Sequence, residues 1–281
     1  MYLSMYHQIA VLGRRSAPGT SLAIPLSRCI PVALATLGAA MAPGLVVCDS
    51  LASMRKLDGT RTQHTDYEGR LFGQYGISAR VVIQDGLRFL PRGRSSLGTY
   101  AGLLEWQARA GSRGHAFCST DWQFEAYDFV MIVSGGKDVY GENAEITPEL
   151  YHALRVTARR ASYLCGYQYG AHVPAGRVII IFGGSAATWR YPSTVGARFD
   201  ERVQQVLRWG KDNLKGVTLV SGAAELATLE DHEVVDRIGH LKYHAGFDKL
   251  LAAMHQWYVI LKGEKVDERP EQHGSKRLSR L

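Results

Sequence analysis

Cysteine is scarce in this chain, and the few cysteines lack the spacings that would give them a metal-binding or cross-linking role. Four occur among the 281 residues, at Cys29, Cys48, Cys118 and Cys165, and no two of them form a CxxC pair. A zinc knuckle needs closely spaced ligand pairs, and a disulfide framework is typical of much shorter chains. The sequence therefore predicts no metal site and no disulfide framework, and we expect the cysteines to pack as small buried apolar residues.

Glycine-rich phosphate loops are missing as well. Neither GxGxxG nor GxxxxGK[ST] occurs in the sequence, and these are the patterns in which backbone N–H groups approach the phosphates of a nucleotide. The nearest approach is IIIFGGSAAT (179–188), whose glycines follow an apolar run without completing either motif. We therefore expect no nucleotide and no other cofactor.

Acidic residues are absent from the first 48 positions, and the two ends of the chain supply most of its formal net charge of +7. Residues 1–48 carry +3 and residues 262–281 carry +2, which leaves 24 basic against 22 acidic residues in between. A nucleic-acid-binding domain instead gathers Lys and Arg on one face, often beside aromatic residues. The nearly neutral central part therefore predicts no nucleic-acid partner.

No apolar stretch is long enough to predict a transmembrane helix. The longest run, CIPVALATLGAAMA (29–42), has 14 residues, whereas a spanning helix needs about 20. Because residues 1–42 combine this run with arginines, serines and no acids, we interpret them as an N-terminal extension with features of a targeting segment. Such a segment indicates import into an organelle or secretion, and without that function we expect a cytoplasmic protein. A buried helix is the alternative interpretation of the run.

The remaining residues divide into one domain and a tail. Residues 262–281 have almost no apolar side chains, and this composition predicts a disordered tail. Residues 43–261 are long enough to bury a complete core as a single domain.

Short runs rich in valine and isoleucine alternate with helical patterns along this domain. The alternation is typical of a parallel sheet covered by helices. The runs predict strands at 44–49, 79–84, 129–135, 177–184 and 216–222. Apolar periodicity predicts helices at 99–110, 147–162, 199–214 and 245–261, the first with Leu103, Leu104 and Trp106 on one side. We therefore expect a three-layer α/β domain with a central parallel sheet of about five strands.

Chemically notable side chains follow several of the predicted strands. In an open α/β sheet, ligands bind at the carboxyl ends of the strands. Asp49 and Ser50 follow the first strand, Gly98 the second, and SGGKDVYGEN (134–143) the third. After the fifth strand, Asp236 comes four residues before His240. A ligand or substrate site is therefore expected at this edge of the sheet.

The order of these blocks resembles that of the SGNH, or GDSL-type, hydrolases, which are esterases and lipases on a flavodoxin-like fold. The family's first block, GDS(L), is similar to Cys48-Asp49-Ser50-Leu51, and its second-block glycine corresponds to Gly98. Its third block, GxND, is similar to Gly135-Gly136-Lys137-Asp138, and its final DxxH corresponds to Asp236 and His240. The resemblance extends over about residues 44–261 and implies the flavodoxin-like fold.

The resemblance also implies a catalytic mechanism. Ser50 would be the nucleophile, His240 its base and Asp236 the group that orients the base, since a serine hydroxyl is a weak nucleophile without such help. The oxyanion of the tetrahedral intermediate would be bound by the Ser50 N–H, the Gly98 N–H and the side chain of Lys137. Asp49, Gly135 and Asp138 belong to the same blocks and would support the site.

Three departures from the family pattern leave alternatives open. Cys48 replaces the first glycine, Lys137 replaces the asparagine, and three residues instead of two separate Asp236 from His240. Lys137 still offers hydrogen-bond donors and adds positive charge, although its stem is more flexible than a short amide. For the base and its partner, His244 and the pair Asp231 with His232 are the alternatives. For Ser50, the alternative is an ordinary helix cap.

These patterns together favour a serine hydrolase that acts on a carboxylester, a lipid or an acetylated sugar through an acyl-serine intermediate. Its partner would be the small-molecule ester or acylated-sugar substrate, and no prediction of oligomeric state follows. The second hypothesis is a catalytically inactive domain of the same fold that binds a ligand or a protein. The third is an unrelated doubly wound nucleotide-binding domain.

Overall fold

The computed structural model describes residues 43–91, 98–114, 127–139, 145–166, 175–182, 193–222, 243 and 245–263. The predicted N-terminal extension and nearly all of the predicted tail lie outside these residues. No helix in the described ranges is long and apolar enough to cross a membrane.

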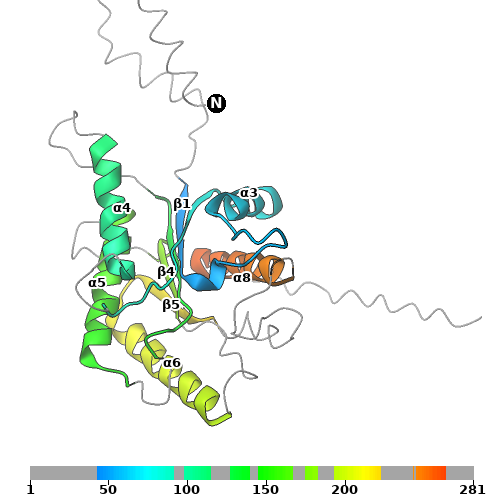
Figure 1. Ribbon diagram of the computed structural model, residues 1–281. Coiled ribbons are helices and arrows are strands. Elements are labelled where there is room, and N and C mark those ends of the chain that lie inside the picture. Colours follow the sequence, from blue (N-terminus) through cyan, green and yellow to red (C-terminus); the bar gives the residue numbers. More distant parts are fainter. Residues whose placement is uncertain are drawn as a thin grey trace, which may run out of the picture. The chain divides into compact units, whose positions relative to one another are not determined.

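Five parallel strands form one sheet in the order β2-β1-β3-β4-β5 (Figure 1). This is the strand order of flavodoxin-like folds, in which the winding direction changes between β1 and β3. The predicted parallel sheet and the flavodoxin-like fold are therefore confirmed. The strands are β1 (Gly44–Cys48), β2 (Ala79–Ile83), β3 (Val130–Val133), β4 (Val178–Phe182) and β5 (Val217–Ser221).

The central strands are buried on both faces, which explains why their sequences are continuously apolar. All five residues of β4, VIIIF, are buried. Successive residues of a strand point to opposite faces, so Val46 and Cys48 belong to one core cluster while Leu45 and Val47 belong to the other. The expected burial of Cys48 is thus confirmed, and burial raises the pKa of its thiol.

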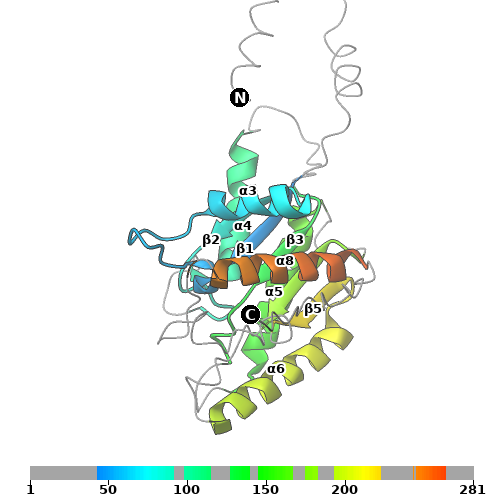
Figure 2. The ribbon, with the colours of Figure 1, turned by 90° about the vertical axis from the view of Figure 1, so that its right-hand side faces the viewer.

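Helices cover both faces of the sheet (Figure 2). On one face lie α3 (His64–Tyr75) and α8 (Ala245–Lys262), which contribute Tyr67 and Trp257 to the core. On the other face lie α4 (Tyr100–Gly114), α5 (Pro148–Leu164) and α6 (Ser193–Asn213). The three-layer arrangement is therefore the predicted one.

Two details differ from the sequence-based expectations. Helix α3 was not predicted, because only two of its twelve residues, Tyr67 and Leu71, are buried. Its ends nevertheless carry local signals, a capping box at the start and the left-handed Gly76 at the end. In α4, Leu103 and Leu104 are buried as expected, but the Trp106 side chain is 50% exposed, so the expectation that it faces the same side was wrong.

Candidate active site

The segments that follow β1 and β3 lie side by side at the carboxyl edge of the sheet. Cys48, the last residue of β1, pairs with Val133, the last residue of β3. Asp49 and Ser50 therefore leave the sheet next to the turn that carries Gly135 and Lys137. This position is the switch point between β1 and β3, where flavodoxin-like folds bind ligands.

Asp49 organises the turn that carries Ser50. Its side chain is 1% exposed and caps the short 3-10 helix η2 (Ser50–Ala52), accepting a hydrogen bond from the Leu51 N–H at 2.9 Å. Its second carboxylate oxygen accepts the Gly135 N–H at 3.0 Å. Burial raises the pKa of Asp49, and the positive charge of Lys137 partly opposes that shift. One carboxyl group thus ties the segment after β1 to the segment after β3.

The Ser50 hydroxyl pairs with a lysine and does not cap a helix. Lys137 Nζ lies 2.6 Å from Ser50 Oγ and 4.0 Å from Asp49 Oδ2. The Lys137 side chain is 28% exposed, so the pair is partly shielded from water. Because Asp49 provides the cap, the alternative interpretation of Ser50 as an ordinary cap does not describe its contacts.

Two glycines shape the turn that presents Lys137. A Cβ atom built on Gly135 would lie 2.9 Å from Asp49 Oδ2, closer than side-chain carbons come to oxygen. Gly136 has a φ of 76°, in the left-handed region that favours glycine, and its N–H donates to Ser134 Oγ at 3.2 Å. The close approach at Gly135 and the reversal at Gly136 direct the chain so that Lys137 reaches Ser50.

Asp138 lies in the same turn but contacts a different loop. Its carboxylate accepts the N–H groups of Phe89 at 2.8 Å and Leu90 at 3.1 Å. Burial raises the pKa of Asp138, and these two donors oppose the shift. Asp138 therefore ties the loop after β2 to the turn after β3.

Gly98 lies at the end of that loop, just before α4. Its carbonyl accepts the Arg88 N–H at 3.2 Å, and a Cβ atom built on it would meet nothing within 4 Å. No hydrogen bond joins Gly98 to Ser50 or Lys137 among the described residues. Its role as an oxyanion donor stays a prediction.

The predicted base and its partner lie outside the described residues. This holds for Asp236 and His240 and for the alternatives His244, Asp231 and His232. The glycine-containing segment after β4, residues 183–192, also lies outside, and so the expectation that it is not a phosphate loop rests on sequence alone. In the part of the chain that the structure describes, no group of three His, Cys, Asp or Glu residues could hold a metal ion.

Thr62 and Tyr67, which the sequence analysis did not single out, form hydrogen bonds to the turn that follows Ser50. The Ala52 carbonyl accepts hydrogen bonds from Thr62 Oγ1 at 2.6 Å and from the Tyr67 hydroxyl at 2.8 Å. Thr62 Oγ1 also accepts the Met54 N–H at 2.9 Å. These contacts fix the end of η2, and no sequence spacing signals them.

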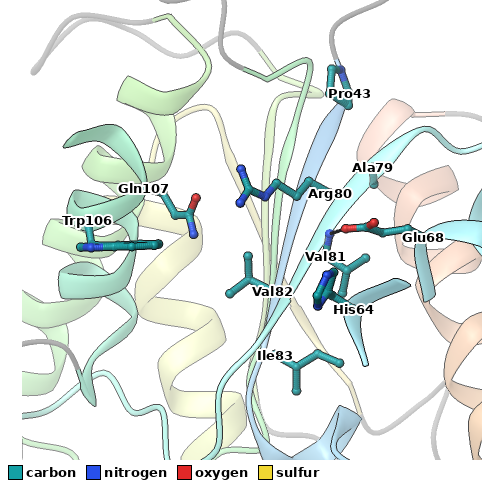
Figure 3. A pocket seen from close by; sticks show the side chains of 10 residues that line it. All are labelled: Pro43, His64, Glu68, Ala79, Arg80, Val81, Val82, Ile83, Trp106 and Gln107. Atoms are coloured by element: carbon teal, nitrogen blue, oxygen red, sulfur yellow. Dashed lines mark hydrogen bonds between the residues drawn. The ribbon is translucent and has the colours of Figure 1, made fainter. Parts of the chain in front are cut away.

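A separate groove of about 550 Å³ runs along β2, the edge strand of the sheet (Figure 3). Glu68 of α3 accepts the Val81 N–H there at 2.9 Å. Because an edge strand with open N–H and C=O groups invites pairing with another chain, this carboxylate protects the middle of the edge. Ser50 and Lys137 do not line this groove. Its lining residues are Pro43, His64, Glu68, Ala79, Arg80, Val81, Val82, Ile83, Trp106 and Gln107.

Comparisons with known proteins give similarities in structure alone. No family model matches the chain, and no curated protein matches it significantly. The chain is similar to a lipase/acylhydrolase from Enterococcus faecalis, with 16% identity, a TM-score of 0.47 and coverage of 79% of this chain and 96% of that chain. It is also similar to Est24, a carbohydrate acetylesterase from Sinorhizobium meliloti, with 15% identity, a TM-score of 0.46 and coverage of 78% and 99%.

Proposed function

We propose that this protein is a serine hydrolase of the SGNH type, with Ser50 as the nucleophile that attacks an ester. The observation that carries the proposal is the 2.6 Å contact between Lys137 Nζ and Ser50 Oγ, at a turn where Asp49 supplies the helix cap. A serine that serves as a cap directs its hydroxyl to a backbone N–H. Ser50 Oγ instead accepts a hydrogen bond from Lys137 Nζ at the switch point, and a serine nucleophile needs a neighbouring group of this kind within hydrogen-bond reach.

Backbone groups at the same turn can stabilise the oxyanion. The Ser50 N–H lies at the start of η2, and no acceptor for it is found among the described residues. The proposal adds the Gly98 N–H, which likewise has no acceptor in the described part of the chain, and the positive charge of Lys137. Preorganised donors of this kind lower the barrier because they need no rearrangement when the negative charge develops.

The motif resemblance suggests which residues assist the nucleophile. By that resemblance, His240 would be a base for Ser50 and Asp236 would orient it. Hydrolysis assays of His240→Ala beside His244→Ala distinguish the two histidines. We expect the larger loss of activity in His240→Ala.

The substrate class follows from the same chemistry. The proposed reaction transfers the acyl group of an ester to Ser50 Oγ, releases the alcohol, and then transfers the acyl group to water. A small carboxylester, a lipid or an acetylated sugar satisfies this scheme, and the scheme needs no metal or nucleotide.

The test is hydrolysis of p-nitrophenyl acetate by the full chain and by Ser50→Ala. We expect the variant to lose at least about 10³-fold in kcat/KM, as serine hydrolases do without their nucleophile. The matched control is Ser53→Ala, three residues further along, because Ser53 Oγ accepts a hydrogen bond from Arg61 and lies outside the proposed site. A Ser50→Ala protein as active as the parent would overturn the proposal, and an inactive parent would favour the silent ligand-binding domain.

A further inference from the structure

The amine of Lys137 lies close enough to the Ser50 hydroxyl to accept its proton. Its Nζ atom is 2.6 Å from Ser50 Oγ, and a candidate base must lie about 2.6–3.2 Å from the atom whose proton it takes. The two residues are 87 positions apart in the sequence, and the pairing of β1 with β3 brings them together. The contact is therefore built into the strand order of the fold.

Asp49 lies beside this pair, and its carboxylate is already committed to backbone donors. Asp49 accepts the Leu51 N–H through one oxygen and the Gly135 N–H through the other, while Lys137 Nζ stays 4.0 Å away. Asp49 thus forms no direct hydrogen bond with Lys137 and leaves its amine directed at Ser50.

The oxyanion, in turn, has donors that do not depend on Lys137. The N–H of Ser50 has no acceptor among the described residues, and it adjoins the nucleophilic oxygen itself. The amine is therefore available for another role. Serine–lysine pairs are a known variant of the serine–histidine arrangement, in which the amine replaces the imidazole.

We infer that Lys137 is the general base of this enzyme, so that Ser50 and Lys137 form a serine–lysine dyad. This inference rests on the proposed function, because it requires Ser50 to be the nucleophile. It replaces two roles that the motif resemblance implies, that of His240 as the base and that of Lys137 as a charged donor to the oxyanion.

The proton and bond changes balance without any further reagent. The neutral amine of Lys137 accepts the Ser50 hydroxyl proton while Oγ forms a bond to the ester carbonyl carbon. The resulting ammonium returns this proton to the leaving alcohol oxygen as the carbon–oxygen bond of the ester breaks. Water then attacks the acyl-serine, Lys137 takes a proton from the water, and that proton returns to Ser50 Oγ when the acyl group departs as the acid.

The experiment compares substitutions that separate charge from basicity. Arginine keeps the positive charge and the donors but cannot lose its proton in a protein, whereas methionine removes both. We measure kcat/KM for p-nitrophenyl acetate in the parent, Lys137→Arg, Lys137→Met, His240→Ala and Ser50→Ala. Lys211→Arg, on the exposed side of α6, is the matched control. Thermal unfolding of each variant checks that the fold is retained.

The dyad predicts that Lys137→Arg and Lys137→Met are equally impaired, by about 100-fold or more, and that His240→Ala is less impaired than either. Aminoethylation of Lys137→Cys restores an amine at nearly the same position and should recover activity. The parent, treated in the same way, is the control that shows whether modification of the natural cysteines changes the activity.

Three results would overturn the dyad. They are a Lys137→Arg protein closer in activity to the parent than to Lys137→Met, a His240→Ala protein less active than Lys137→Arg, and an aminoethylated cysteine variant that stays inactive. If Ser50→Ala is inactive in the same series, the hydrolase proposal survives any of them. An inactive parent overturns both proposals.

Discussion

Replacing Gly135 with alanine should disturb the link between the segments after β1 and β3. The new Cβ atom would lie 2.9 Å from Asp49 Oδ2 and 3.5 Å from Oδ1, and Asp49 is 1% exposed, so its carboxylate has little room to move. Overpacking of a buried site costs about 1–3 kcal/mol, and weakening the hydrogen bond from the Gly135 N–H to Asp49 adds to the loss. We expect a decrease of about 2 kcal/mol in the free energy of unfolding, or about 4–8 °C in Tm.

Differential scanning calorimetry of parent and variant measures this effect, and a second glycine provides the control. Gly73 lies on the exposed side of α3, where a Cβ atom would meet nothing within 4 Å, and alanine is a better helix former than glycine. Gly73→Ala should therefore raise the free energy of unfolding by about 0.5–1 kcal/mol. If Gly135→Ala melts at the same temperature as the parent, the close approach of Asp49 to Gly135 is not as described.

Three further predictions concern carboxylates. Asp138→Ala leaves the N–H groups of Phe89 and Leu90 without their acceptor and should lower the free energy of unfolding by about 2 kcal/mol, measured by urea titration; an unchanged midpoint would contradict this. Burial raises the pKa of Asp49 above its ordinary 3.8, so at a pH just above 3.8 the native state holds a proton that the unfolded chain has released. The free energy of unfolding of the parent, relative to that of Asp49→Asn, should therefore fall as pH rises above 3.8. A rising difference would refute that sign. Glu68→Ala should increase self-association in size-exclusion chromatography at rising protein concentration, whereas the exposed Glu201→Ala should not.

The sheet could be predicted from sequence because its three central strands are fully buried. Runs such as VIIIF in β4 have no polar alternation to resolve, and glycine or a polar residue follows each run. Helix α3 was harder to predict because it buries only Tyr67 and Leu71. Its end signals were present in the sequence, but with so few apolar residues between them they did not stand out from ordinary turns.

The residues of the candidate site were easier to predict than their contacts. Asp49, Ser50, Gly135 and Lys137 were all named from their positions after strands, and the structure brings these four together. Which side chain meets which depends on the order of the strands, since β1 and β3 are neighbours while β2 intervenes in the sequence. The bond from Lys137 to Ser50 therefore could not be inferred from spacing.

The contacts of Asp138 could not be predicted from the sequence either. The motif resemblance made it a supporting residue of the site, and in the structure it supports a loop that lies 48 and 49 residues away in sequence. A carboxylate that accepts two backbone N–H groups has no signature beyond its own identity. Such long-range contacts depend on the loop conformation, which local sequence does not determine.

The most direct measurement of the central claim is the site at which a fluorophosphonate reacts with the intact chain. Intact-mass spectrometry followed by peptide mapping should find a single adduct on the peptide that contains Ser50, and no adduct in the Ser50→Ala protein. An adduct on another residue, or an unmodified parent, would contradict the claim that the hydroxyl held by Lys137 is a nucleophile.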